Sequence, residues 1–419
     1  MNNRTKREKT MSDKARNRSV DTPEKERLCS RCGLCMVDAW TPKESIQGCV
    51  FTIGWLGKQE VEIFGRERSL QDSDEMLLGI SRERFDARMK KPLSKIQFTG
   101  IITGIAKKAF ETGLVEAVVT LHRSKEEYFF PVPVLARSTE EILASGGSKP
   151  VLAQTLVSLE KAYQQGIKHL LVVGAACHVH NLREFQRQFP YLKNMDIYVV
   201  GIPCTDNIYP KNLRFILSRI SRSHETVRHY EFMQDFTVHL RHVDGTLERV
   251  PFFSLPPELS SAEVLTPCCR SCFDYMNGLS DITVGYMAAP LDTEKMNQWV
   301  VVRTEKGEKL RSLIADELET FPEGSRGDRR DAVKQYAQQM MERLAGGGEE
   351  RQPMSMEDGM SFAEWLYDVG PRELEFVRYG IETHLIRNYY FVKQNYPQLL
   401  PTLVPKYAYR ILEDYDLKP

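Results

Sequence analysis

Between residues 97 and 221 the hydrophobic pattern switches repeatedly between short apolar runs and helical spacing. Three runs have the length of buried strands: 117–121, 168–173 and 196–200. Helical spacing covers 99–112, a short helix opened by a capping box at 138–141, then 155–165 and 177–188. Gly174 and Gly201 are expected to end the second and third strands. This alternation predicts an α/β fold with a parallel-sheet core and helices on both faces.

The pattern changes on either side of this core. Residues 228–253 alternate as antiparallel strands, with a hairpin turn at Asp244-Gly245. Helical spacing returns at 331–344, a glycine-rich linker is expected at 346–351, and the last 60 residues are predicted to be helical. We therefore predict five segments: a flexible tail at 1–25, an N-terminal cysteine segment at 26–95, an α/β core at 96–221, an α+β region at 222–320 and a helical region at 321–419.

Composition narrows the class of protein. The chain has 419 residues, of which 42% are hydrophobic, so it can bury a large core. Its 57 basic and 57 acidic residues give zero formal net charge, which does not favour nucleic acid as a partner. No apolar run approaches the roughly 18 residues of a spanning helix, and no apolar signal segment opens the chain. The sequence predicts a cytoplasmic protein without a transmembrane segment.

Nine cysteines are the clearest chemical feature. Cys29, Cys32 and Cys35 are separated by two-residue gaps and followed by Cys49, a spacing that lets one loop wrap thiolates around an inorganic centre. A second group, Cys268, Cys269 and Cys272, contains another two-residue gap. Structural zinc also uses such pairs, and any single cysteine can be a buried apolar residue. Disulfides are disfavoured because the chain is much larger than cysteine-dense secreted domains.

Cys177 and Cys204 each follow a predicted buried strand by a few residues. Both should therefore lie at the carboxyl edge of the same parallel sheet, where open α/β folds bind ligands. The sequence thus predicts that two distant cysteines approach one ligand-binding edge.

Four motifs carry a resemblance to a known family. They are C-S-R-C-G-L-C at 29–35, T-G-I-I-T at 99–103, H-Y-E-F-M-Q-D-F at 229–236 and C-F-D-Y-M-N-G-L-S-D-I-T-V-G-Y-M at 272–287. The chain closely resembles the deazaflavin-dependent hydrogenase and formate dehydrogenase β-subunit superfamily from about Arg27 to Tyr415. Within it, the sequence looks like ferredoxin-dependent 3,8-divinyl chlorophyllide 8-vinyl reductases and the related 7-hydroxymethyl chlorophyll reductases.

The resemblance implies FAD, two [4Fe-4S] clusters and reduced ferredoxin as electron donor. The family's cluster positions correspond to Cys29, Cys32, Cys35, Cys49, Cys177, Cys204, Cys269 and Cys272, leaving Cys268 as the extra cysteine. Which of them share a cluster is left open. For FAD, the helix expected after Thr99 and Gly100 offers backbone N–H groups to a phosphate. The other predicted FAD contacts are Thr103, Lys149 and Asn207.

One departure from the family pattern is His178 and His180, where glutamine is usual. We interpret both as helix-surface substitutions, with tuning of a nearby cluster as the alternative.

The predicted activity is reduction of the 8-vinyl group of 3,8-divinyl (proto)chlorophyllide in (bacterio)chlorophyll biosynthesis. The alternatives are 7-hydroxymethyl chlorophyll a reductase, a deazaflavin-reducing β-subunit of a hydrogenase-like complex, and a zinc-stabilised non-enzymatic module. Peripheral contact with photosynthetic membranes and a homo-oligomer are compatible with this activity. Acid candidates are Asp274, Tyr275, Tyr230 and Asp235, and aromatic residues at 252–253, 275 and 286 could line a slot for the ring. The basic run at 82–95 is a hypothetical docking site for an acidic ferredoxin.

Overall fold

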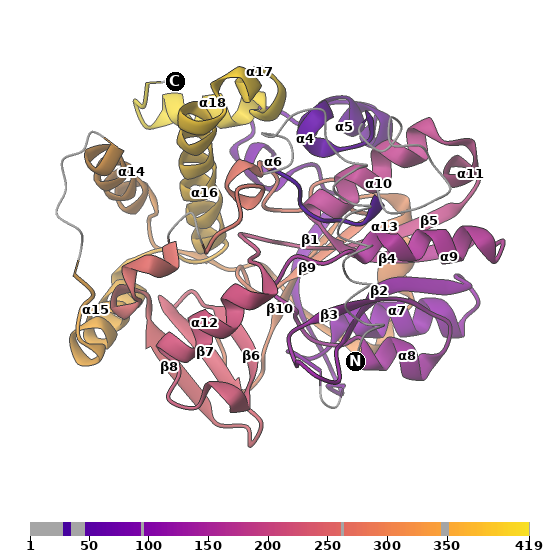
Figure 1. Ribbon diagram of the computed structural model, residues 1–419, viewed down its shortest axis with the longest axis horizontal. Helices are drawn as coiled ribbons and strands as arrows, with labels where there is room; N and C mark the ends of the chain where they lie inside the picture. The colour runs from indigo at the N-terminus through magenta and orange to yellow at the C-terminus, as the bar shows by residue number, and fades with distance from the viewer. Residues whose placement is uncertain (1–27, 35–46, 94–95, 261–263, 345–351, 419) are drawn as a thin grey trace, which may run out of the picture.

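The computed structural model describes residues 28–34, 47–93, 96–260, 264–344 and 352–418 (Figure 1). The predicted polar tail, the glycine-rich linker and Cys35 lie outside these residues.

An eight-stranded mixed sheet forms the centre of the molecule, with strand order β11-β1-β10-β9-β5-β4-β2-β3. The strands are β1 (Glu83–Met89), β2 (Ala117–Arg123), β3 (Pro131–Ala136), β4 (His169–Ala175), β5 (Asp196–Ile202), β9 (Ile282–Gly285), β10 (Gln298–Val302) and β11 (Leu318–Phe321). The neighbours β2, β4, β5 and β9 are parallel, and antiparallel strands flank them on both sides. The predicted α/β class is confirmed.

Helices cover both faces of this sheet (Figure 1). On β5, Ile197 and Val199 pack in one apolar core with α9 (Leu159–Gln164) and α10 (Ala176–Gln188). Tyr198 and Val200 face the opposite core, which includes α7 (Ile101–Glu111) and α13 (Glu305–Ser312). Because successive strand residues point to opposite faces, this two-sided burial explains why the central strands read as continuous apolar runs.

Gly174 and Gly201 do not end their strands, contrary to expectation. They lie inside β4 and β5 and are paired with each other in register. A Cβ atom on Gly201 would lie 2.6 Å from Ser280 Oγ and 2.7 Å from Asn277 Cγ. The glycine is therefore needed for the close approach of another segment rather than for a turn.

A smaller antiparallel sheet contains β6 (Val227–Phe232), β7 (Thr237–His242) and β8 (Leu247–Pro251). The predicted turn at Asp244-Gly245 is confirmed and joins β7 to β8. Val238 and Leu240 of this sheet share a core with Ile216 and Leu217 of α12 (Pro210–Ile220). The large sheet takes strands from three of the five predicted segments, and the division of the chain into those segments stays a prediction.

The C-terminal region is helical, as expected. Its helices are α14 (Arg330–Leu344), α15 (Met356–Val369), α16 (Leu374–Asn395), α17 (Leu400–Leu403) and α18 (Lys406–Asp414), and β12 (Ser325–Arg326) pairs with β13 (Arg372–Glu373) between them. The remaining helices are α4 (Val50–Ile53), α5 (Gly57–Phe64), α6 (Ser73–Leu78), α8 (Thr139–Ala144) and α11 (Pro190–Lys193). None of the described helices is long and apolar enough to cross a membrane.

Candidate functional site

Four thiols meet beyond the carboxyl ends of β4 and β5. Cys177 lies in the first turn of α10, and Cys204 follows the end of β5 by two residues. Burial raises the pKa of the Cys204 thiol, and the neighbouring thiols of Cys269 and Cys177 raise it further. Burial likewise raises the pKa of Cys272, with added contributions from Cys177 and Cys269. The predicted approach of Cys177 and Cys204 is thus confirmed, and the second cysteine group joins them.

The N-terminal cysteine loop packs against the same place. Cys32 O accepts a 2.9 Å hydrogen bond from Leu156 N, and its thiol is a neighbour of Cys29. Burial raises the pKa of the Cys32 thiol to about 11. Asn181 on α10 links this loop to the next segment: its Nδ2 donates to Cys32 Sγ at 3.1 Å, and its Oδ1 accepts from Val50 N at 2.7 Å. Cys49 precedes α4 and stands beside that second bond.

The thiols receive hydrogen bonds suited to thiolates. Asn207 donates from its backbone N to Cys269 Sγ at 3.2 Å and from its Nδ2 to Cys204 Sγ at 3.4 Å. Thr266 Oγ1 donates to Cys269 Sγ at 3.0 Å. Hydrogen bonds to sulfur are one means by which proteins adjust iron–sulfur clusters, so this donor set fits such a group. No three described His, Cys, Asp or Glu residues are placed to hold a single metal ion.

Cys268 stands apart from this set. Its sulfur lies 4.0 Å from Cys269 Sγ and 3.1 Å from Thr266 Oγ1, and the Cys268 residue is 2% exposed. The contact with Cys268 lowers the pKa of the Cys269 thiol, and either sulfur can donate the hydrogen bond between them. The interpretation of Cys268 as the extra cysteine stays a prediction.

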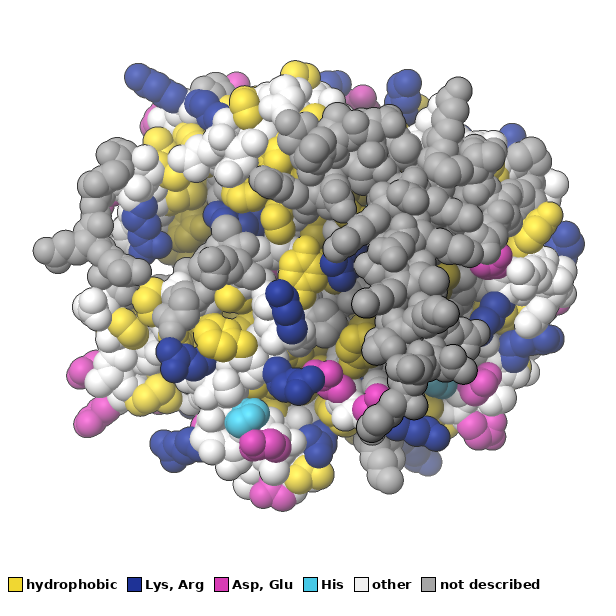
Figure 2. Space-filling view, viewed as in Figure 1, with side chains coloured by type: hydrophobic (Ala, Val, Ile, Leu, Met, Phe, Trp, Pro, Cys, Tyr) yellow, Lys and Arg dark blue, Asp and Glu magenta, His cyan; other side chains and the backbone are white. Residues whose placement is uncertain are grey.

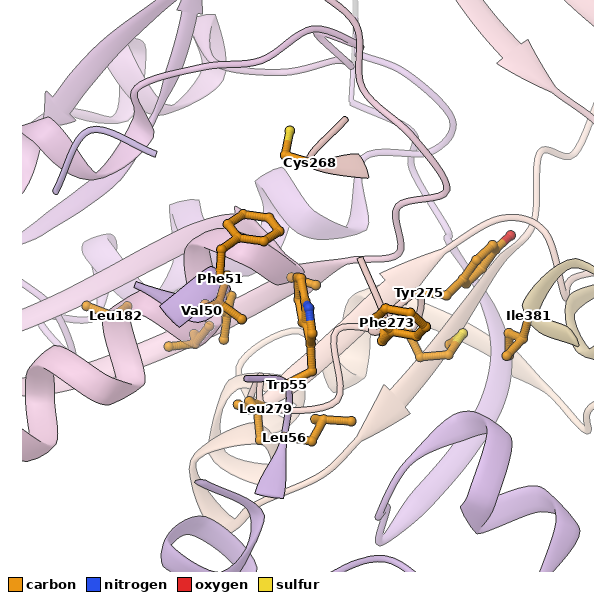
Figure 3. Close-up of a cluster of buried hydrophobic side chains, with 14 of the residues drawn as sticks. Val50, Phe51, Trp55, Leu56, Leu182, Cys268, Phe273, Tyr275, Leu279 and Ile381 are labelled. Carbon is orange, nitrogen blue, oxygen red and sulfur yellow. The ribbon is translucent and has the colours of Figure 1, made fainter. Parts of the chain in front are cut away.

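Helix α16 holds the second cysteine group from the other side. Asn388 Nδ2 donates to the carbonyl oxygens of Cys269 and Cys272 at 2.9 and 2.6 Å. Arg387 forms a bidentate ion pair with Asp206, at 2.8 and 2.9 Å. Figure 3 shows the apolar support near these turns, with Trp55 between Phe51 and Phe273. The cysteine loops are therefore fixed by a long helix and by the core.

The interpretation of His178 and His180 as surface residues is wrong, because they are 6% and 0% exposed. His180 Nε2 lies 2.9 Å from Asp274 Oδ2, and its Nδ1 lies 3.2 Å from Gln59 Oε1. Trp55 packs edge-on against the same ring at 4.9 Å. Both histidines are therefore part of the packed interior.

The residues predicted to bind FAD divide into two places. Asn207 lies among the thiols, as described above. Thr99 and Gly100 precede α7, and Thr103 is buried in its first turn. Thr99 Oγ1 already accepts from Met89 N at 3.1 Å, so the hydroxyl serves the local fold, while Gly100 has φ +89°. Lys149 lies near this loop, since Gln97 Oε1 accepts from Ser148 N at 2.6 Å.

Lys149 belongs to a group of cations, with Arg123 and Arg228, for which the described part of the chain supplies no carboxylate partner. Burial and Arg123 lower the pKa of the Lys149 ammonium to about 7. The Nε and Nη2 atoms of Arg123 are buried and have no hydrogen-bond partner in the described part of the chain. Arg123 and Arg228 both stack on Tyr128, at 4.5 and 4.6 Å from the ring centre. Half-buried cations, among which Arg123 has unsatisfied N–H groups, fit an anionic ligand such as the pyrophosphate of FAD.

A shallow pocket lies beside Phe98, which immediately precedes Thr99. Phe98 and Tyr286 both line it and stack directly on each other, with their ring centres 4.7 Å apart. Glu231 of β6 also lines the pocket and is 6% exposed. Burial raises the pKa of Glu231 to about 8, although a hydrogen bond from Gln97 opposes the shift. Glu231 stands in the 229–236 motif that carries the family resemblance, but its burial in the pocket is not visible in the sequence.

The four acid candidates predicted from the sequence are two carboxyls whose pKa is lowered and two tyrosines whose pKa is raised. Hydrogen bonds and charge from His239 hold the pKa of Asp235 below its usual range despite burial, and His180 does the same for Asp274. Both carboxyls are therefore ionised near neutral pH and cannot donate a proton. Burial raises the pKa of Tyr230 and Tyr275. Of the predicted slot residues, Tyr286 lines the pocket, whereas Phe252 and Phe253 pack near Phe236.

The basic run at 82–95 is largely neutralised. Arg82 pairs with Glu305 and Glu308, Arg84 with Asp74 and Glu323, and Arg88 with Glu319. Figure 2 likewise shows basic and acidic side chains interspersed on the face it presents. The run forms much of β1, so it does not present the single-sign surface on which the docking hypothesis depended.

Comparison with known proteins gives consistent matches. The C-terminal domain of coenzyme F420 hydrogenase/dehydrogenase beta subunits matches residues 167–323, and the N-terminal domain matches residues 84–160. A chain of the F420-reducing [NiFe] hydrogenase complex of Methanosarcina barkeri has a similar fold, with a TM-score of 0.52 and 23% identity over 59% of this chain and 84% of that one.

Relatives also match along most of the sequence. The chloroplastic 7-hydroxymethyl chlorophyll a reductase of rice, Oryza sativa subsp. japonica, is 38% identical over 93% of this chain and 82% of that protein. An uncharacterised protein of the cyanobacterium Nostoc is also 38% identical, over 94% and 95% of the two chains. The coenzyme F420 hydrogenase subunit beta of Methanothermobacter thermautotrophicus is 26% identical over 59% of this chain. The protein therefore belongs to the coenzyme F420 hydrogenase/dehydrogenase beta-subunit family, whose named members here are oxidoreductases or their subunits.

Proposed function

We propose that this protein is a ferredoxin-dependent iron–sulfur flavoprotein that reduces a substituent on a chlorophyll-type ring. The observation that carries this proposal is the 38% identity to the rice reductase over 93% of this chain. We place the reaction at the 8-vinyl group of 3,8-divinyl (proto)chlorophyllide. The second candidate is the 7-hydroxymethyl group, which the name of that relative favours.

The thiols divide into two sets in this proposal. Cys177 and Cys269 are electrostatic neighbours of each other and of both Cys204 and Cys272, and we assign these four thiols to one [4Fe-4S] cluster. Cys29 and Cys32 are neighbours in the N-terminal loop, and we assign them, with Cys35 and Cys49, to the other cluster. Cys32 also lies near Cys177, so the two sets adjoin.

FAD would be held between the N-terminal end of α7 and the cations around Lys149. Arg123 and Lys149 would pair with its pyrophosphate, and Gly100 would permit close approach of the backbone. When bound, the two clusters and FAD would collect single electrons from ferredoxin and supply them to the substrate as a pair. We propose that the edge of the ring docks at the pocket beside Phe98, against the stacked pair of Phe98 and Tyr286.

A paired substrate assay tests the proposal. The purified protein, ferredoxin and a reductant are incubated anaerobically with divinyl chlorophyllide and, separately, with 7-hydroxymethyl chlorophyll. We expect reduction of the vinyl group, dependent on ferredoxin. Turnover of the hydroxymethyl substrate alone would support the second candidate.

Two further outcomes would contradict the proposal as a whole. Reduction of a soluble deazaflavin, with neither tetrapyrrole consumed, would indicate the β-subunit alternative. A colourless protein containing zinc, without flavin, iron or sulfide, would indicate a zinc-stabilised module instead.

A further inference from the structure

We propose that the carboxyl group of Glu231 is the general acid that protonates the substrate in the pocket lined by Phe98 and Tyr286. This inference rests on the proposed function and adds the proton donor that the reaction needs. It applies to either substituent, because both reductions consume two electrons and two protons, of which one proton travels in the hydride equivalent and the other must come from an acid.

The position of Glu231 is the first argument. The residue lies on β6, is 6% exposed, and lines the pocket together with the stacked rings of Phe98 and Tyr286. Gln97 Nε2 donates to Glu231 Oε1, and Gln97 Oε1 accepts from Ser148 N. Gln97 therefore joins the carboxyl to the loop that carries Lys149, so the acid and the proposed pyrophosphate site are fixed relative to each other.

The groups facing Glu231 are consistent with a carboxyl that is protonated near neutral pH. Arg241 on β7 favours the ionised form, but burial outweighs it and raises the pKa to about 8. His229 Nδ1 is 4.0 Å from Glu231 Oε1, and burial with Arg123 and Arg241 lowers the pKa of that imidazole to about 4. His229 is therefore neutral and cannot pair with an ionised Glu231.

Two more groups face the carboxyl. His239 is directly opposite Glu231 in the β6–β7 register, but its Nε2 contacts Asp235 Oδ2 at 2.8 Å. Burial, then Glu231, raises the pKa of the Tyr286 phenol well above its usual range. Among the described acids that the pocket exposes to a ligand, Asp292 has its pKa lowered by backbone hydrogen bonds from residues 294 and 295, so it is ionised. Glu231 is thus the carboxyl suited to donate.

The proton balance is simple. In vinyl reduction, one vinyl carbon gains a hydride equivalent, and the π-electron pair at the other carbon takes the proton from Glu231, which gives the ethyl group. In hydroxymethyl reduction, the same proton leaves with the hydroxyl as water while the carbon gains the hydride equivalent. In either case ferredoxin supplies both electrons, and the proton within the hydride equivalent comes from solvent. The Glu231 carboxylate then regains a proton from solvent through the mouth of the pocket.

Glu231→Gln keeps the size of the side chain and removes the acid. We expect turnover to fall by roughly 10²–10⁴-fold, the usual range for loss of a general acid. Flavin content and the rate of flavin reduction by ferredoxin should stay at wild-type values, because these steps do not need the proton. Glu248→Gln is the matched control: Glu248 lies on β8 of the same small sheet, outside the pocket, and should leave turnover unchanged.

Two readouts separate an acid from a structural residue. Wild-type turnover should decline as pH rises through about 8, since the ionised carboxylate cannot donate, and Glu231→Asp should retain this limb with lower activity. Independently of turnover, infrared spectra should contain the carbonyl band of a protonated carboxyl that disappears in Glu231→Gln and titrates near the same pH.

The outcomes are distinguishable. An active wild-type enzyme whose Glu231→Gln variant turns over equally fast, or whose carboxyl band is absent at neutral pH, would overturn the role of Glu231 only. A wild-type enzyme that reduces neither tetrapyrrole would overturn the proposed function and this inference together.

Discussion

Asp86 is a buried carboxyl at a position where ionisation is unfavourable. It lies on β1 and is 1% exposed. Burial, followed by the charges of Glu323 and Glu373, raises its pKa to about 7. An ordinary aspartate has a pKa of about 3.9, so the unfolded chain releases this proton more readily than the folded one. The contribution of Asp86 to stability is therefore present below about pH 4 and is lost as pH rises through about 7.

Replacing Asp86 by asparagine should remove this pH dependence. We expect Asp86→Asn to gain about 1–3 kcal/mol of unfolding free energy relative to the wild type between pH 5 and pH 8, since each pKa unit is worth about 1.4 kcal/mol and water relaxes part of the cost. Anaerobic urea unfolding at several pH values measures the gap. Asp414→Asn, on the surface of α18, is the control, and its difference in unfolding free energy from the wild type should not change with pH. A gap for Asp86→Asn that does not change with pH would contradict the assignment.

For single residues, the sequence predicted the candidate functional groups well where the spacing between residues carries information. The two-residue gaps between cysteines are visible directly in the sequence. The places of Cys177 and Cys204 could be predicted because the end of an apolar run marks the end of a strand. Glu231 and Asp86 were not, because a carboxylate on an alternating strand looks the same whether its face meets solvent or an adjoining element. Their altered pKa values arise from burial by residues far away in the sequence.

Among the elements, β5 depends on a glycine that the sequence analysis misread. Gly201→Ala would place a Cβ atom against Ser280 Oγ and Asn277 Cγ. Asn277 Nδ2 donates to Gly174 O at 2.8 Å, so the displaced loop would also lose a bond to β4. We expect a loss of about 1–3 kcal/mol in unfolding free energy, the usual cost of overpacking. Cys204 lies three residues on, so iron content should fall as well.

Gly104→Ala is the matched control for this prediction. Gly104 lies in α7, and its added Cβ would meet only the flexible end of Met89, at 3.3 Å. Alanine also favours a helix over glycine by about 1 kcal/mol. The control should therefore be neutral or stabilising in urea unfolding. Equal behaviour of the two variants would show that the contacts of Gly201 do not limit packing at β5.

The predictable elements were those with local signals. The strands β2, β4 and β5 and the helices α7 and α10 were expected within a few residues, since glycines, caps and periodicity mark them in the sequence. The strands β1, β9, β10 and β11 were not expected in this sheet. Their places depend on pairing between distant segments, such as Phe85 with Val300, and a single sequence does not encode that pairing locally.

Across the whole molecule, the thiols join parts of the chain that are far apart. Cys32 belongs to the N-terminal loop, Cys177 and Cys204 to the edge of the large sheet, and Cys269 to the turn held by α16. Burial raises the pKa of Cys177, Cys204 and Cys272, which disfavours bare thiolates. A cationic inorganic centre would favour the thiolates and would tie these segments together, so cluster binding should contribute to the stability of the fold.

This linkage gives a prediction for the cysteines themselves. Cys204→Ser should lose about half of the bound iron and sulfide, because one of two clusters loses a ligand, and its thermal unfolding midpoint should fall. Cys268→Ser should keep the full iron content, since Cys268 contacts the Cys269 sulfur but is not a proposed ligand. Iron and sulfide analysis of anaerobically purified protein, together with thermal unfolding, measures both effects. Equal iron loss in the two variants would contradict the division of the nine cysteines into eight ligands and one extra cysteine. Full iron in Cys204→Ser would exclude Cys204 from the proposed cluster between the sheet and α16.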